Sequence, residues 1–347
     1  MRYAISLVLL ILLAFGALSF AQNGPRQTQA WDVYADTWVA SDALDRSLPG
    51  FTEVGLPRED RWVGIFYFLW LDRIYSGRPC DVTEVLAQEP SHRIWPMSTM
   101  NWGESEDGYY ISTDPYVLRK HCNLLVDAGV DTLIFDTSNA VLYLDTLKAL
   151  CEVYLQIRSE GGKTPQLTFL IHNDAARDLF EQFFSIERYK ELWFYWKGRP
   201  LVLPVREPSG LDQELKNFFT LRHCWAWTSG QDTWSWVTHW PQQYGWHESP
   251  DLPEELSVSI AQHPTTNYGR SNLGNMQPPY DDDFHTGTEH LGLYFEQQWQ
   301  RALEVDPEFI YVTGWNEWIA GHYIVQPGTD TAFLGKQLNL GDYFHVD

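Results

Sequence analysis

Residues 311–323 combine strand-like apolar positions with one carboxylate that lies between two tryptophans. The stretch reads YVTGWNEWIAGHY, in which Glu317 is flanked by Trp315 and Trp318. It continues an apolar run that begins at Phe309, which is typical of a strand buried in a sheet. Burying an ionised carboxylate without a partner is costly, so a lone glutamate usually lies at the surface. Glu317 is therefore the first candidate for acid–base chemistry.

Hydrolysis of a glycosidic bond needs two carboxyl groups, one protonated and one ionised, on either side of the bond. Asp136 and Asp174 each follow an apolar run, in LIFDTSN and LTFLIHND, and are the candidate catalytic partners of Glu317. Either aspartate could instead cap a helix or fix a loop. Glu104 and Glu248, in long loops, are further alternatives.

Amides, imidazoles and tryptophans accompany these carboxylates at the expected strand ends and in the two long loops. Amide and imidazole groups can position sugar hydroxyls, and aromatic faces can stack on pyranose rings. The candidate substrate-binding residues are His172, Asn173, His263, Asn316, Trp102, Glu104, Trp227, Trp246 and His247. The 17 tryptophans fit such a site, and they fit a tryptophan-rich core equally well.

A metal site is the competing interpretation of three of these polar residues. His172, Asp174 and His263 would supply metal ligands in a metal-dependent hydrolase or lyase. The spacing of the histidines matches no zinc motif, so we expect no metal and no cofactor.

Alternating strands and helices must position these residues. Apolar runs predict strands at 63–70, 131–139, 167–174, 199–205, 223–230, 255–264 and 309–318. Helical patterns cover 116–129, 144–162, 175–192, 211–219 and 290–306. This order predicts an α/β fold with a parallel sheet, and seven strands without a nucleotide loop favour a (β/α)8 TIM-barrel-like domain. In such a barrel the carboxyl ends of the strands converge on one site. No closing strand–helix pair is evident after Trp318, so the barrel could be incomplete at the C-terminus.

The first 21 residues have the features of a secretory signal peptide, with Arg2 before an apolar run and Ala21 at the expected cleavage site. We expect a signal peptide at 1–21, an N-terminal extension at 22–60 and a single catalytic domain at 61–347. No later apolar run reaches the roughly 20 residues that span a bilayer. The mature chain is thus expected to be secreted or periplasmic, without membrane insertion.

Charge and cysteine content narrow the partners further. The formal net charge of −22 argues against a nucleic-acid partner, because phosphate binding relies on lysine and arginine. A poly- or oligosaccharide is the expected partner. Cys80, Cys122, Cys151 and Cys224 match no zinc template, and a disulfide among them is possible in an exported chain. Cys122 and Cys151 could equally be buried free thiols.

The segment GWNEW, in a chain of this element order, resembles the barrel glycoside hydrolases of family 99 and the related WbsX-like proteins. Agreement is best over Thr313–Gly321, with a similar order of elements over roughly 63–321. The resemblance implies a base-and-acid pair whose first member is Glu317, with the base assisting attack by the 2-hydroxyl of the sugar. The family keeps a second glutamate three residues later, where this chain has Ala320, which cannot transfer a proton.

Two functions follow as expectations. The first is an exported glycoside hydrolase-like protein that cleaves glycosidic bonds in a polysaccharide by carboxylate acid/base chemistry. The second is a non-catalytic carbohydrate-binding barrel of a glycan-uptake system, which Ala320 favours.

Overall fold

The computed structural model describes most of the chain, in several ranges. These are residues 39–42, 45–56, 58–71, 85, 87–92, 100–102, 105–260, 291–325, 332–333, 336–337 and 341–344. Contacts divide the chain into two compact units, Met1–Glu53 and Val54–Asp347. A short helix, α2 (Phe51–Val54), crosses the division. Everything that follows concerns the second unit.

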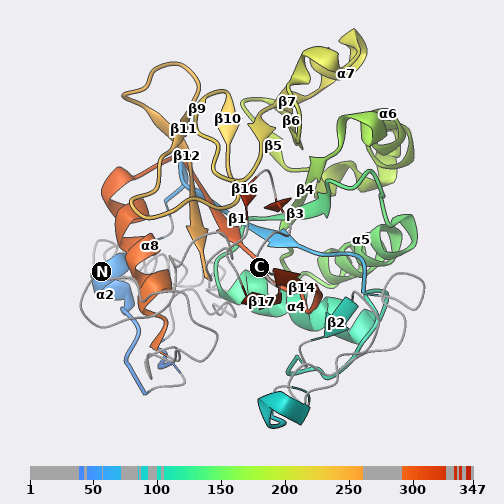
Figure 1. The fold of residues 1–347 in the computed structure, drawn as a ribbon. Helices are drawn as coiled ribbons and strands as arrows, with labels where there is room; N and C mark the ends of the chain where they lie inside the picture. Colours follow the sequence, from blue (N-terminus) through green and yellow to red (C-terminus); the bar gives the residue numbers. More distant parts are fainter. Residues whose placement is uncertain are drawn as a thin grey trace, which may run out of the picture. The chain divides into compact units, whose positions relative to one another are not determined.

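A parallel sheet forms the centre of the second unit (Figure 1). Its long strands are β1 (Trp62–Tyr67), β3 (Thr132–Thr137), β4 (Gln166–Ile171), β6 (Arg199–Pro204), β12 (Pro253–Ser259) and β13 (Phe309–Thr313). They lie in the order β6-β4-β3-β1-β13-β12, and each neighbouring pair is parallel. A short antiparallel strand, β5 (Tyr195–Trp196), lies at the edge beside β6.

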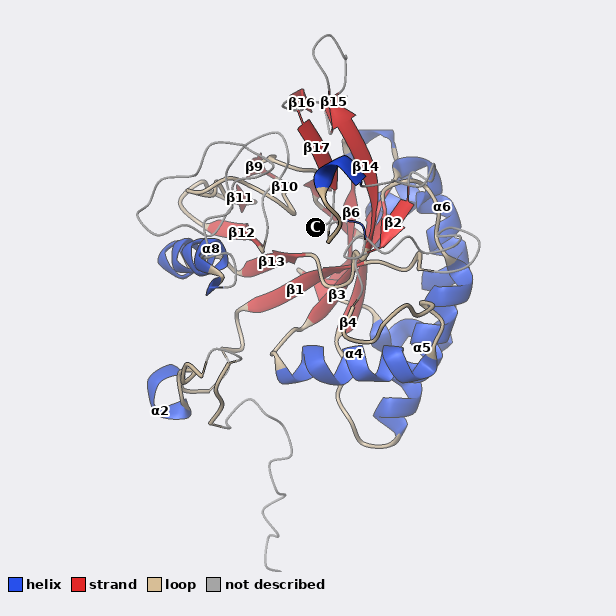
Figure 2. Cartoon of the chain, turned by 60° about the horizontal axis from the view of Figure 1, so that its bottom comes forward, coloured by secondary structure: helices blue, strands red, loops and turns tan. Residues whose placement is uncertain are grey.

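Helices connect these strands and cover the outer face of the curled sheet (Figure 2). They are α4 (Pro115–Asp127), α5 (Leu144–Ser159), α6 (Ala176–Leu179), α7 (Gln213–Phe218) and α8 (Leu293–Val305). A π-helical turn at Phe180–Phe184 and 3-10 turns at Asn173–Ala175 and Glu187–Leu192 flank α6. The expected α/β class with a barrel-like sheet is confirmed.

Alternate residues of each strand face opposite sides of the sheet, as the pleat requires. Ile65, Leu133 and Leu256 pack outward in the cluster that includes helix residues of α4 and α5. Phe66 and Ile134 belong to a second cluster on the inner face. The inner face of the sheet is thus filled by apolar side chains, and the candidate site residues follow at the carboxyl ends of its strands.

The expected strand at 223–230 is replaced by two-residue pieces. β7 (Thr220–Leu221) pairs with β6, β8 (His223–Cys224) pairs with β10 (Thr233–Trp234), and β9 (Gly230–Gln231) pairs with β11 (Gly245–Trp246). β11 in turn pairs with β12. Trp227 and Asp232 have positive φ angles of 57° and 54°, which interrupt a regular strand. The path from β6 round to β12 is therefore made of short steps and not of one continuous ladder.

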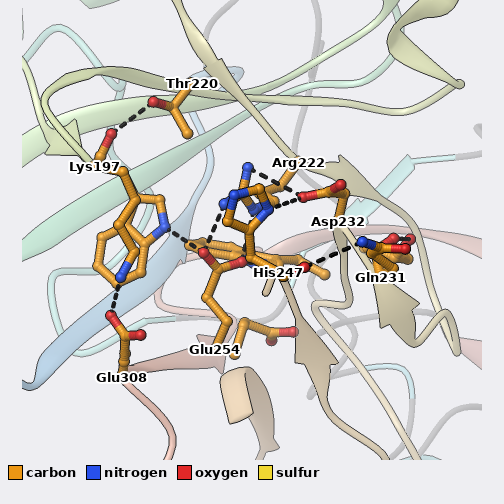
Figure 3. Close-up of polar contacts among 12 residues, drawn as sticks. Lys197, Thr220, Arg222, Gln231, Asp232, His247, Glu254 and Glu308 are labelled. Atoms are coloured by element: carbon orange, nitrogen blue, oxygen red, sulfur yellow. Dashed lines mark hydrogen bonds and ion pairs between the residues drawn. The ribbon is translucent and has the colours of Figure 1, made fainter. Parts of the chain in front are cut away.

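A buried ion pair bridges these steps (Figure 3). Arg222, the single residue between β7 and β8, donates from Nε and Nη2 to Glu254 on β12 at 2.6 and 2.7 Å. The indole N–H groups of Trp196 and Trp234 donate to the same carboxylate at 2.8 and 2.9 Å. Arg222 also lies 3.5 Å from Asp232, the residue between β9 and β10. The side chains thus join the places where the ladder is interrupted.

The electrostatics of Glu254 follow from these contacts. Burial pushes the pKa of its carboxyl up, but the guanidinium and the two indole donors outweigh that effect, and the pKa lies below its usual value. The neighbouring Glu255 accepts through Oε2 from the backbone N–H of Ser235 at 3.1 Å. Burial raises the pKa of Glu255 well above the usual value. The pKa values of these two adjacent carboxyl groups are therefore shifted in opposite directions.

Two glutamine side chains take the place of a strand beside the far half of β12. Gln242 donates to the carbonyl of Ser257 at 3.1 Å, and Gln298 of α8 accepts from the N–H of Ser259 at 3.2 Å. Both glutamines are fully buried. Their amides satisfy backbone groups of β12 that would otherwise lie at an unpaired edge.

Three cysteines, Cys122, Cys151 and Cys224, are buried free thiols, and Cys80 lies outside the described residues. Within the described ranges, none of the helices combines the length and apolar composition of a membrane span.

Candidate functional site

Glu317 follows the carboxyl end of β13, beside the end of β1. The strand stops at Thr313, and Gly314, with a φ of 72°, turns the chain. The N–H of Trp315 then donates to the carbonyl of Phe66 at 3.0 Å, which continues the contact with β1. The side chain of Glu317 is buried, with 7% of its surface exposed. The structure thus brings one largely buried carboxyl group to the end of the two central strands.

Asn316 fixes this turn through both ends of its amide. Its Nδ2 donates to the carbonyl of Phe68 at 3.0 Å, and its Oδ1 accepts from the N–H of Phe68 at 2.8 Å. The side chain therefore bonds to β1 in the way that the backbone of a neighbouring strand would. Asn316 was expected to bind substrate, whereas both of its polar atoms are engaged with the protein backbone. Its geometry is that of a residue that positions Glu317.

We expect Asn316→Ala to lower kcat on a confirmed glycan substrate about 100-fold, because a displacement of roughly 1 Å at a reacting group has an effect of that size. KM should change less than about threefold, since no substrate contact is removed. Asparagine does not titrate, so the pH optimum should stay the same. Steady-state kinetics below the melting temperature of the variant check this. A raised KM with unchanged kcat would instead show that Asn316 contacts substrate.

Asp136 lies at the carboxyl end of β3, on the other side of β1 from β13. Its register partner on β4 is Leu170, a member of the inner cluster, so Asp136 faces the inner side of the sheet. It accepts from the N–H of Ser138 at 3.0 Å. Strands are about 4.8 Å apart, so β3 and β13 are separated by about 10 Å across β1. The strand that carries Asp136 and the strand that leads to Glu317 therefore flank the same central strand.

The polar residues after β4 bond mainly to nearby loops, in contrast to Asp136 at the end of β3. His172 accepts through Nδ1 from the N–H of Asp174 at 3.3 Å, and caps a short 3-10 helix. The carboxylate of Asp174 is largely exposed. The side chain of Asn173 bonds to the backbone of Arg206 and Glu207 in the loop after β6. Asp174 and Asn173 thus have the contacts of loop-fixing residues, and Asp136 has the more enclosed carboxyl group.

Of the candidate tryptophans, Trp102 lies close to the Glu317 segment and Trp227 lies beside the inner cluster. Trp102 belongs to β2 (Met100–Trp102), and its register partner is Ile319 at the start of β14 (Ile319–Val325). β14 also pairs with β17 (Gly341–Phe344). Trp227 packs against the inner cluster, and its backbone N–H donates to the carbonyl of Val237 at 2.8 Å.

Trp246 and His247 lie at the opposite end of the sheet. Trp246 pairs with Pro253, the first residue of β12, at the amino ends of the parallel strands. His247 lies 2.5 Å from Asp232, beside the Arg222 network and not beside Glu317 (Figure 3). The remaining two candidates, His263 and Glu104, lie outside the described residues. The long loop that contains Trp246 therefore does not bring it to the carboxyl ends of the strands.

A buried histidine supports the site from the helix side. The hydroxyl of Tyr67 on β1 lies 3.0 Å from Nδ1 of His121 on α4. Nε2 of His121 lies 3.8 Å from Asp107, which also binds Lys120 at 2.7 Å. Burial lowers the pKa of His121 to about 4, so this imidazole is neutral near pH 7. A histidine among the apolar positions of a helix was the sequence signal for this contact.

The rings of Trp315 and Tyr110 both pack edge-on against His121, with centroids 5.6 and 5.7 Å away. Hydrogen bonds between Leu71 and Ser112 join the loop that carries Tyr110 to the end of β1. Tyr110 thus belongs to the same side of the sheet as Glu317, although the sequence did not single it out. As for metals, the described ranges contain no group of three or more histidine, cysteine, aspartate or glutamate side chains that could hold an ion.

Comparisons with known proteins add two structural likenesses. No family model and no curated protein matches the sequence. Among solved structures, the fold is similar to the GH99 endo-alpha-mannosidase from Bacteroides thetaiotaomicron, with a TM-score of 0.48 and 15% identity over 75% of this chain and 86% of that chain. A complex of the same enzyme with bis-tris-propane gives a TM-score of 0.47 and 14% identity, covering 75% and 84% of the two chains.

Proposed function

We propose that this chain is an exported glycoside hydrolase that cleaves a polysaccharide through Glu317 and Asp136. The observation that carries the proposal is the placement of Glu317. A turn clamped to β1 by Asn316 holds this carboxyl group, largely buried, at the carboxyl ends of the central strands. In barrel folds, the residues at these strand ends form the active site.

Asp136 is the proposed second carboxyl group. It faces the inner side from β3, with β1 between it and the strand that leads to Glu317. One carboxyl group would protonate the leaving oxygen while the other acts on the opposite face of the sugar ring. A separation of ~5 Å between the carboxyl groups would give retention of anomeric configuration, and ~6.5–9.5 Å would give inversion. Trp227 and Trp102 are proposed to contact the sugar rings, and His172 to position hydroxyls.

Product release from a glycan panel tests the proposal. The panel contains α-mannan, xylan, polygalacturonate and carrageenan, which represent neutral, uronate-bearing and sulfated polymers. We expect the wild-type chain to release reducing sugar from at least one of them. The anomer that forms first, observed by NMR, reports retention or inversion. No product from any glycan that the chain binds would reject catalysis.

A non-catalytic binding barrel is the second candidate, and one observation favours it. Ala320 occupies the position at which the family that the sequence resembles has its second glutamate. Calorimetric binding of a panel glycan without product, at any pH between 4 and 9, would support this function over hydrolysis.

A further inference from the structure

Four hydrogen-bond donors lie buried beside the Glu317 turn without an acceptor. They are Nε1 of Trp70, Trp315 and Trp318 and the hydroxyl of Tyr110, and none of them has a hydrogen-bond partner among the residues that the structure describes. Buried polar groups in proteins are almost always paired, because an unpaired donor loses its bonds to water without replacement. Several orphan donors in one place therefore point to a group that is bound there in function.

The four donors form one contiguous group, called here the donor cluster. Trp70 and Trp318 pack on the small apolar cluster that contains Tyr110. Trp315 and Tyr110 both pack edge-on against the imidazole of His121. Trp315 and Trp318 flank Glu317 and Asn316 in the sequence, so the donor cluster lies where the proposed reaction would occur.

The hydroxyl of Tyr110 is the best-defined member. Tyr110 is buried, with 9% of its surface exposed. Burial raises the pKa of this hydroxyl, while N–H groups of Asn316 and Trp318 nearby act in the opposite direction. Neither contact has hydrogen-bond geometry, so the hydroxyl of Tyr110 and Nε1 of Trp318 each remain without a hydrogen-bond partner. The proton of Tyr110 therefore still needs an acceptor.

We propose that the donor cluster binds oxygen acceptors of the glycan, namely ring, glycosidic or hydroxyl oxygens of a neutral sugar unit. This inference rests on the proposed function and deepens it, because it names the groups that hold the sugar. The tryptophans act here through their N–H edges, which is a different contact from stacking on a pyranose face.

Charge favours a neutral sugar over an anionic one. The four donors are uncharged, and Lys120, which precedes His121 on α4, is already paired with Asp107. His121 is neutral near pH 7, since burial lowers its pKa to about 4. The ionised member of the proposed pair, Glu317 and Asp136, would repel a uronate or a sulfate. An oxygen with partial charge suits this environment better than a full anion.

A matched pair of tyrosine variants tests the proposal. Tyr110 and Tyr67 both contact His121, but the hydroxyl of Tyr67 has a partner and that of Tyr110 has none. Tyr110→Phe removes an unpaired buried hydroxyl, so the free protein should melt about 1–3 °C higher than wild type. Tyr67→Phe leaves His121 without its partner, so the melting temperature should fall by a similar amount.

Tyr110→Phe should weaken glycan binding although it stabilises the free protein. In a Glu317→Gln background, which prevents cleavage, we expect Tyr110→Phe to weaken calorimetric binding of α-mannan or xylan about 10-fold. Tyr67→Phe should leave the Kd within about twofold. Polygalacturonate and carrageenan should bind more weakly than the neutral glycans in both forms.

Three outcomes would overturn the inference in distinguishable ways. Unchanged glycan affinity in Tyr110→Phe rejects the donor cluster as a binding site and leaves the proposed function in place. A lower melting temperature in Tyr110→Phe shows that its hydroxyl already has a partner. A wild-type chain that binds none of the four panel glycans removes the proposed function and, with it, this inference.

Discussion

Glu317→Gln is expected to lower kcat/KM on a cleaved polysaccharide by about 10³-fold, the size of a typical acid–base contribution. Glutamine has nearly the same shape and can still accept a hydrogen bond, but it cannot ionise or carry a proton. The buried position beside Asn316 makes a compensating shift of the loop unfavourable. Binding of the same glycan should persist, because the change removes one charge and leaves the ring-contacting residues. Initial rates and calorimetry on the same preparation measure both effects.

The matched control is Glu308→Gln, at the other end of the same strand. Glu308 immediately precedes β13 and bonds to Lys197, far from the carboxyl ends of the strands. It should retain wild-type kinetics. Asp136→Asn should resemble Glu317→Gln if the two carboxyl groups act as a pair. Full activity of Glu317→Gln would show that Glu317 is not a catalytic residue, whatever the activity of Asp136→Asn.

The long strands could be predicted because their signals are local. The apolar runs at 63–70, 131–139 and 309–318 correspond to β1, β3 and β13, since strands buried on both faces contain few polar residues. Alternation with amphipathic helices was enough to predict the parallel sheet and its barrel-like curl. The carboxyl-end position of Glu317 and Asp136 then followed from strand direction alone.

The interrupted part of the barrel could not be predicted in the same way. The run at 223–230 looks like a strand by composition. Trp227 within it and Asp232 just after it have positive φ angles, which interrupt the strand pairing. Whether a tryptophan or an aspartate takes a positive φ depends on tertiary contacts. Arg222 and Glu254 are 32 residues apart in the sequence, and nothing local indicates that they pair. The placement of Trp246 and His247 at the amino ends followed from that same irregular path.

The roles of Asn316 and Asn173 also depended on distant backbone groups. An asparagine at a strand end suits a sugar hydroxyl and a free carbonyl equally well by residue type. Only the structure shows that Asn316 bonds to Phe68 and that Asn173 bonds to the loop after β6. Conversely, Tyr110 lies in a loop without any motif. Its position is defined by contacts with His121 and with the end of β1.

The Arg222–Glu254 pair carries the largest expected effect on stability. Arg222→Met should lower the free energy of unfolding by about 3–5 kcal/mol, because it leaves an ionised carboxylate buried with only two indole donors. Methionine keeps much of the volume of the side chain, so the loss is mainly electrostatic. Arg222→Lys should recover only part of it, since an ammonium group cannot make the two parallel bonds that the guanidinium makes. Chemical denaturation monitored by tryptophan fluorescence and circular dichroism gives the values.

Arg177→Met is the control for a surface pair. Arg177 binds Asp212 at 2.5 Å, but both side chains are more than a third exposed, at 37% and 46%. Exposed pairs contribute about 0–1 kcal/mol, so this variant should be nearly neutral. If Arg222→Met were as mild as Arg177→Met, the buried pair would not be what joins the interrupted strands.

A double variant that removes both charges distinguishes the effect of the charge pair from other contacts of Arg222. Glu254→Gln in the Arg222→Met background eliminates the uncompensated carboxylate, so the double variant should be more stable than Arg222→Met alone. The amide oxygen of glutamine can still accept from one of the two indole N–H groups, which now donate to different oxygens of Glu254. Because the network lies at the amino ends of the strands, the double variant should also keep its glycan affinity. A double variant that is no more stable than Arg222→Met would mean that the guanidinium stabilises the barrel through Asp232 or by packing, and not by neutralising Glu254.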